Sequence, residues 1–75
     1  MTRDEWVTAF AAAAGAPAPT PDDIDALLEL AGLAAHASER TAAPITCWVA
    51  AVAGLRPSEA LDLAESLERH PLVSL

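Results

Sequence analysis

The sequence predicts an all-α protein, a compact bundle of four short helices. Hydrophobic residues make up 53% of the chain, many of them alanine, the strongest helix former. Tyrosine is absent, β-branched residues are few, and no run alternates between apolar and polar residues as a half-buried strand would. Seventy-five residues form at most one domain, so we expect residues 1–75 to fold as a single helical domain. Its core should supply only about 3–5 kcal/mol.

Clear start and stop signals frame the first two helices. Thr2 and Glu5 have the spacing of a capping box, and Gly15 can end the helix in a left-handed conformation. Prolines at 17 and 19 make residues 15–20 a stiff connector. Thr20 then caps a second helix, which should extend to about Ser38.

The second helix carries two apolar strips. The broader one contains Ile24, Leu27, Leu28 and several alanines. Leu30 and Leu33 form the second strip, which meets either the fourth helix or another protein; in a small bundle we favour the fourth helix.

The third helix, from about Pro44 to Gly54, is the segment around which we expect the bundle to form. It has no charged residue, so it should be buried or paired on all sides. We expect it to be the most buried element, with large residues filling the core and small residues admitting a neighbouring helix. The large face consists of Ile45, Trp48, Val49 and Val52, and the other sides carry Thr46, Cys47, Ala50, Ala51 and Ala53. Trp6 of the first helix is likewise expected in the core.

The fourth helix should begin near Pro57 or Ser58 and end before Pro71. Its expected inward face consists of Ala60, Leu61, Leu63, Ala64 and Leu67. The apolar tail that follows, residues 72–75, either folds back over the bundle or marks a junction with further sequence.

Charge and composition exclude several classes of function. The net charge is −7, from 11 acidic residues against four arginines and no lysine. Binding of nucleic acid or of an anionic membrane requires a basic surface, so neither is expected. The apolar runs, of about a dozen residues, are too short to span a bilayer. A single cysteine fits a reducing cytoplasm.

One polar cluster, His36, Glu39 and Arg40, is a candidate site. His36 and Glu39 have the spacing of helix-borne metal ligands, but no second pair completes a site, so we expect no bound metal. Arg40 either holds a carboxylate or phosphate of a partner, or caps the carbonyls at the end of the second helix; the sequence favours neither. Cys47 lacks a neighbouring charge to activate it, so we expect a structural thiol. We assign no catalytic, cofactor-binding or metal-binding residue.

Three segments resemble a small actinobacterial domain family of unknown function. They are Asp4-Glu5-Trp6, the run from Leu27 to Ala31, and the run from Ala34 to Thr46, within an overall match of about residues 2–55. The chain departs from the family pattern at Thr41, where proline is usual, and at Cys47-Trp48. Family members occur alone or behind a domain similar to the molybdenum-cofactor guanylyltransferase. The resemblance implies an association with molybdopterin guanine dinucleotide biosynthesis, but the guanylyltransferase's glycine-rich loop is absent here.

These observations predict a non-catalytic, cytoplasmic protein-docking or accessory domain, possessing no cofactor and associated with molybdenum-cofactor biosynthesis. The expected partner is another protein or a second copy, contacted through His36, Glu39, Arg40, Leu30 and Leu33. Two alternatives stay open. One is a small anion- or cofactor-binding protein or enzyme that uses His36, Glu39 and Arg40. The other is a self-associating structural protein that pairs through Leu30 and Leu33.

Overall fold

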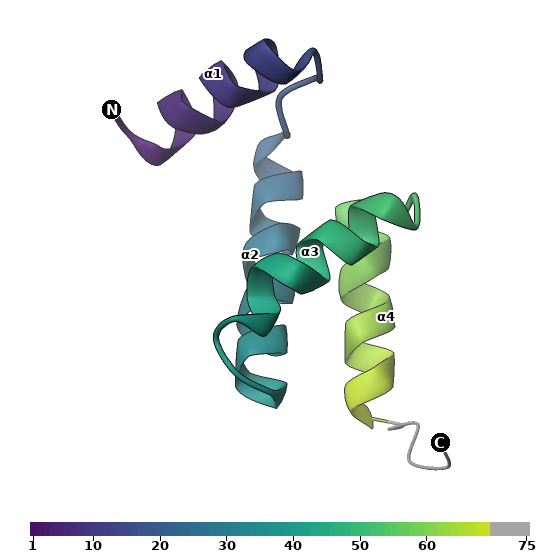
Figure 1. Ribbon diagram of the computed structural model, residues 1–75. Helices are drawn as coiled ribbons and strands as arrows, with labels where there is room; N and C mark the ends of the chain where they lie inside the picture. Colours follow the sequence, from purple (N-terminus) through teal and green to yellow (C-terminus); the bar gives the residue numbers. More distant parts are fainter. Residues whose placement is uncertain (70–75) are drawn as a thin grey trace.

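The computed structural model describes residues 1–69 and contains four α-helices (Figure 1). The described part contains no strand, which confirms the predicted all-α bundle of four short helices. Pro71 and the tail 72–75, for which the sequence raised expectations, lie outside the described residues. The helices are α1 (Arg3–Ala14), α2 (Pro21–Ala37), α3 (Ala42–Val52) and α4 (Pro57–Arg69).

The predicted capping box of α1 is present, and α2 begins with a second one. The Thr2 hydroxyl accepts a hydrogen bond from the Glu5 amide at 3.1 Å, and the Glu5 carboxylate accepts one from the Thr2 amide at 2.8 Å. Thr20 and Asp23 repeat the arrangement at the start of α2, with both bonds at 3.1 Å. Gly15 ends α1 with φ of 75°, as expected for a left-handed cap.

Helix α3 begins two residues earlier than the sequence predicted. Pro44 was the predicted start of the helix, but it occupies the third helical position. The first four amides of a helix have no intrahelical acceptor, so the missing N–H of proline costs nothing there. The turn before α3 is closed instead by backbone bonds from the amides of Ala42 and Ala43 to the carbonyls of Glu39 and Arg40.

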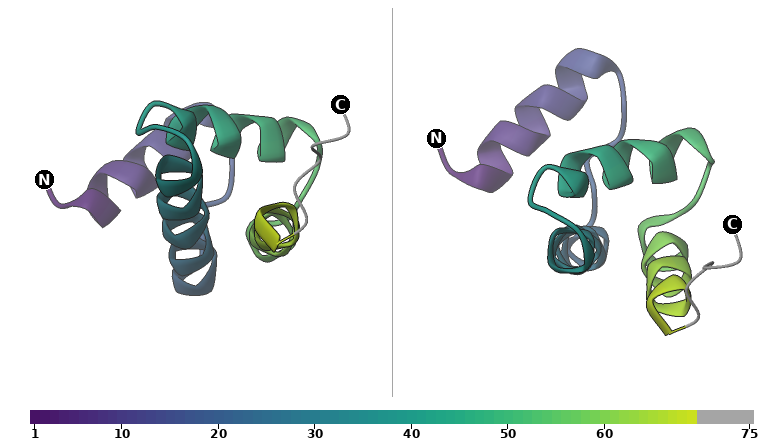
Figure 2. Two further views of the ribbon diagram at one scale, coloured as in Figure 1. Left: turned by 90° about the horizontal axis from the view of Figure 1, so that it is seen from below. Right: turned by 60° about the horizontal axis from the view of Figure 1, so that its bottom comes forward.

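Helix α2 is the central element, and α3 and α4 both pack against it (Figures 1 and 2). The buried core of the described residues contains one side chain from each of these helices, Leu30, Ala50 and Ala60. Leu30 is only 1% exposed. The strip that contains Leu30 therefore faces the rest of the bundle, as we favoured. Cys47, Leu55, Leu61 and Ala64 pack around this core.

The expected orientation of α3 is wrong. Its small side turns inward through Ala50 and Cys47, while the four large residues predicted to fill the core are exposed. Trp48 is 67% exposed, and α3 contributes no more buried residues than α2 or α4. The small side allows the α3 backbone to approach α2 closely, and close-packed interiors favour such an approach. We call the exposed residues the outer face of α3: Ile45, Trp48, Val49 and Val52.

In α4, too, two residues that were predicted to lie in the core are exposed. Leu63 and Leu67 were expected to point inward, but both have high solvent exposure, whereas Ala60 is buried. The small residues of α4 again lie closest to α2. The fully buried positions of the described bundle are therefore one leucine and two alanines, and Leu55 and Leu61 pack around them together with Cys47 and Ala64.

Helix α1 projects away from the other three helices (Figure 1). It has no buried residue, and the prediction that Trp6 belongs to the core is wrong. The rings of Trp6 and Phe10 stack on each other, with centroids 6.1 Å apart, and both are about 60% exposed. We call Trp6, Val7 and Phe10 the aromatic stripe of α1.

Candidate functional site

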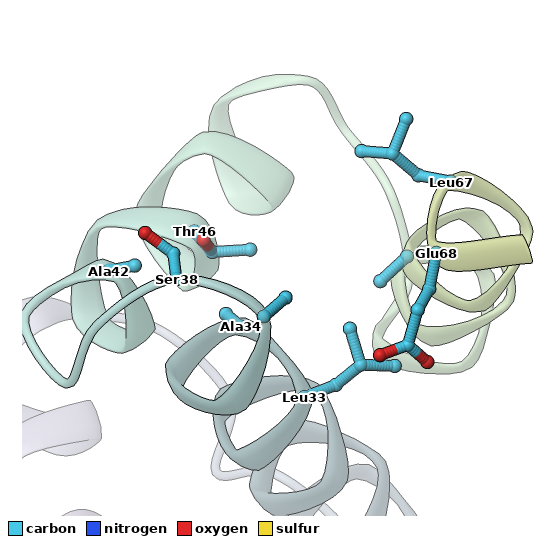
Figure 3. Close-up of a pocket in the computed structure, with 9 residues that line it drawn as sticks. Leu33, Ala34, Ser38, Ala42, Thr46, Leu67 and Glu68 are labelled. Atoms are coloured by element: carbon cyan, nitrogen blue, oxygen red, sulfur yellow. The ribbon is translucent and has the colours of Figure 1, made fainter. Parts of the chain in front are cut away.

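A groove lies between α2, α3 and α4. It encloses about 510 Å³ and is open on one side (Figure 3). In the close-up, Leu33 of α2 and Glu68 of α4 reach toward each other across one edge, and Thr46 of α3 directs its methyl group into the space. The lining residues are Leu33, Ala34, Ala37, Ser38, Ala42, Thr46, Ala64, Leu67 and Glu68. We call this hollow the docking groove.

A second hollow of about 270 Å³ continues the docking groove between α3 and α4. The two hollows share Thr46, Ala64 and Leu67, so they adjoin each other. Leu30 contributes to the wall of the second hollow, and α3 contributes Ala50 and Ala53 together with Val49 of its outer face.

The groove exists because the residues that line it are short. The helices meet over Leu30, but Ala34, Ala37, Ala42 and Ala64 are too small to fill the space between the helix ends. The larger Leu67 stands at the border and is 47% exposed. An alanine-rich sequence therefore produces both the close contact of α2 with its neighbours and the hollow beside it.

The chemistry of the groove suits an apolar occupant. Among residues 1–69, the polar residues of its lining are Ser38, Thr46 and Glu68, and none of the lining residues is a cation. No buried side-chain polar atom in the described part lacks a hydrogen-bond partner. A binding pocket for a phosphate or a charged cofactor would need convergent donors, and these walls do not provide them.

The predicted polar cluster lies at one end of the groove. Ser38 and Ala42 line the groove, and Glu39 and Arg40 lie in the turn that joins them. The Thr41 hydroxyl donates to the Glu39 carboxylate at 3.1 Å. His36, Glu39 and Arg40 are all exposed.

Capping by Arg40 finds no support in its contacts. Among residues 1–69 the Arg40 guanidinium makes no hydrogen bond, and the one ion pair joins Arg3 to Asp4. The end of α2 is closed instead by the Ser38 amide, which donates to the Ala34 carbonyl at 3.1 Å. Arg40 is therefore an exposed donor beside the groove, with no partner in the described part of the chain.

The structure separates the two leucines predicted to contact a partner. Leu33 lines the docking groove and is half-buried. Leu30 is enclosed by α3 and α4, so only Leu33 of the pair has a surface that a partner could reach.

Metal and thiol chemistry have no assembled site in the described residues. No three His, Cys, Asp or Glu side chains gather there in a way that could hold a metal ion. Cys47 packs against the core from the inner side of α3 and is half-buried. This position fits the structural role expected of it.

Sequence reasoning missed the residues that build most of the groove. Thr46 was assigned to the smaller sides of the third helix, and Ala64 and Leu67 to the inward face of the fourth. Ala37 and Ala42 were not proposed for any site. The sequence feature that marks them is the high density of alanine near the end of α2 and the start of α3, which the turn 38–42 joins. The pattern marks where helices approach, but it does not indicate how much space they leave.

Comparison with known proteins assigns a family. A family model described as a domain of unknown function, DUF6457, matches residues 1–71. No curated protein and no solved structure matches the chain. Within the described residues, no helix combines the length and the hydrophobicity needed to cross a membrane.

Proposed function

The chain belongs to the DUF6457 family, whose description assigns no function, and we propose that it is a non-catalytic protein-docking domain. The observation that carries this proposal is the docking groove, an open hollow of about 510 Å³ with a predominantly apolar lining. Grooves of this kind in helical proteins accept the apolar face of an amphipathic segment.

The occupant we propose is an amphipathic helix of a partner protein, apolar on one face and basic along its flanks. The apolar face matches the leucines and alanines of the lining. The basic flanks match a chain of net charge −7, whose groove has Glu68 in its wall. Such complementarity raises the rate of association and selects among partners.

The turn at the end of the groove sets the orientation of the partner. Glu39 offers an acceptor and Arg40 a planar donor, side by side in sequence between two lining residues. Arg40 can bind a carboxylate of the partner bidentately. His36, Glu39 and Arg40 therefore act as recognition groups outside the apolar contact.

The pathway we propose is molybdenum-cofactor biosynthesis, in the cytoplasm. Its support is the resemblance to domains found behind guanylyltransferase-like domains, together with the single cysteine of a chain that suits a reducing compartment. In this proposal the domain brings a partner protein to the pathway and performs no transfer itself.

Paired surface leucines provide a matched test of the groove. Leu67 borders the groove and Leu28 lies on α2 outside both hollows; they are 47% and 53% exposed. Tagged wild type, Leu67→Glu and Leu28→Glu are used to capture proteins from the source organism, and each captured protein is quantified. Docking in the groove predicts a partner that Leu67→Glu loses and Leu28→Glu retains. Equal capture by both variants contradicts the proposal.

A second variant closes the groove without adding charge. Ala37 lines the groove but is itself exposed, so Ala37→Leu narrows the hollow while leaving the core unchanged. It should lose the same partner as Leu67→Glu and keep the wild-type melting temperature.

The double variant Glu39→Ala, Arg40→Ala tests the turn. Orientation of a partner requires unchanged melting and weaker capture of the partner identified above. Capping of α2 would instead lower the melting temperature with capture intact. The alternative of an anion-binding protein predicts that wild type, but not the double variant, shows chemical-shift changes at residues 36–42 when inorganic phosphate is added.

A further inference from the structure

Two apolar surfaces lie outside the docking groove and have no partner in the described part of the chain. One is the aromatic stripe of α1, and the other is the outer face of α3. Trp6, Phe10 and Trp48 are each at least 60% exposed. Exposed apolar areas of this size on a soluble chain mark interaction sites.

Helix α1 needs a contact that the described part of the chain does not provide. It has 12 residues, none of them buried, and isolated helices shorter than about 12–15 residues are marginal in water. The connector to α2 contains Pro17 and Pro19, which hold it extended. It places α1 away from the other three helices (Figure 1). A stiff arm that ends in an apolar helix is suited to reach a neighbouring molecule.

We propose that two copies of this chain associate by exchanging α1, so that the aromatic stripe of each copy packs on the outer face of α3 in the other. The contact is reciprocal, so two copies close into a dimer with two-fold symmetry and leave neither surface exposed. Both surfaces lie outside the docking groove, although Val49 also lines the adjoining second hollow, and the proposal does not depend on the function proposed for the groove.

The exposed area approaches what a stable dimer needs. At about 60% exposure, the three aromatic rings present on the order of 400 Å² per chain. Ile45, Val49 and Val52, each more than half exposed, add an aliphatic surface of similar kind. Together these side chains approach the roughly 800 Å² that each partner contributes to a standard interface.

Charge favours a second copy at these surfaces, although the chain as a whole is strongly acidic. Helix α3 contains no charged residue, and the charges of α1 are confined to Arg3, Asp4 and Glu5 in its first turn. Two copies can therefore meet along these faces without placing like charges in the contact. The surfaces through which they would repel each other lie elsewhere.

Sedimentation equilibrium of the full chain tests the exchange. The wild type should dimerise, and Phe10→Glu or Trp48→Glu should each raise the dissociation constant by at least about tenfold. Leu28→Glu adds the same charge outside both surfaces and should leave the constant unchanged, as should Leu67→Glu in the docking groove. Circular dichroism checks that each variant keeps its helices.

An equimolar mixture of Phe10→Glu and Trp48→Glu identifies which surfaces meet. Exchange predicts partial recovery of dimer, since the mixed pair contains one wild-type α1 on one wild-type α3. A dimer that Trp48→Glu breaks and Phe10→Glu does not would show α3 packing on α3, and would overturn the exchange. A wild type that stays monomeric at about 1 mM would also overturn it, whether α1 stays exposed or folds onto its own α3.

Discussion

On α3 the small side chains face the bundle and the large apolar side chains face solvent, which is the reverse of what their sizes suggest. The inner side carries Ala50 and Cys47, and it packs on Leu30 of α2. The outer side carries the largest apolar residues of the helix and lies in solvent. In this chain the small residues make the fold, because they permit close approach to α2, and the large residues are left for other contacts.

The largest expected effect on stability comes from truncating Leu30, the large side chain that is fully buried in the described core. Leu30→Ala should destabilise the fold by about 2–5 kcal/mol, since it deletes a fully buried side chain and leaves a cavity. A core of this size supplies only about 3–5 kcal/mol, so the variant should be largely unfolded by circular dichroism. Leu28→Ala, the exposed control on the same helix, should change stability by less than about 0.5 kcal/mol. Equal effects would show that α2 has no preferred inner strip.

Enlarging the inner side of α3 should be the next most damaging change. Ala50→Leu forces a larger side chain between α3 and α2 and should cost about 1–3 kcal/mol. The neighbouring Ala51 is exposed, so Ala51→Leu should be almost neutral. Urea unfolding of the two variants compares the two sides of the helix directly. Tolerance of leucine at position 50 would mean that α3 does not approach α2 closely.

Removing each capping box in turn compares the contribution of a packed helix, α2, to stability with that of α1. Thr20→Ala removes the cap of α2 and should lower the free energy of unfolding by about 1 kcal/mol. Thr2→Ala removes the same interaction from α1, which does not pack on the bundle, so it should reduce helical signal while leaving the unfolding midpoint of the monomer unchanged. A lowered midpoint for Thr2→Ala would show that α1 contributes to the cooperative unit.

The sequence predicts helix ends well because their determinants are local. Thr2, Thr20 and Gly15 adopt the predicted roles through hydrogen bonds and dihedral angles within a few residues. Pro44 is the exception, since its position in the first turn makes it compatible with a helix that starts earlier.

The inward position of Leu30 could be predicted for α2, although Leu28 of its broader apolar strip is 53% exposed; the inward face of α3 could not be predicted. Helix α2 places charged residues opposite its apolar strips, so the sequence pattern distinguishes a solvent side from an inner side. Helix α3 has no charged residue, and both sides of it satisfy an apolar pattern. The choice between them depended on how closely two backbones could approach, which is a tertiary property. The docking groove could not be predicted for the same reason, although its turn at Glu39 and Arg40 was singled out.

Unfolding of Trp48→Ala in urea tests most directly the claim that α3 packs through its small side. The measurement is made at concentrations low enough for the wild type to be monomeric, so that only the fold is compared. The structure predicts a change of less than about 0.5 kcal/mol, because the ring is 67% exposed. A loss of about 3–5 kcal/mol would place the ring in the core and contradict the account.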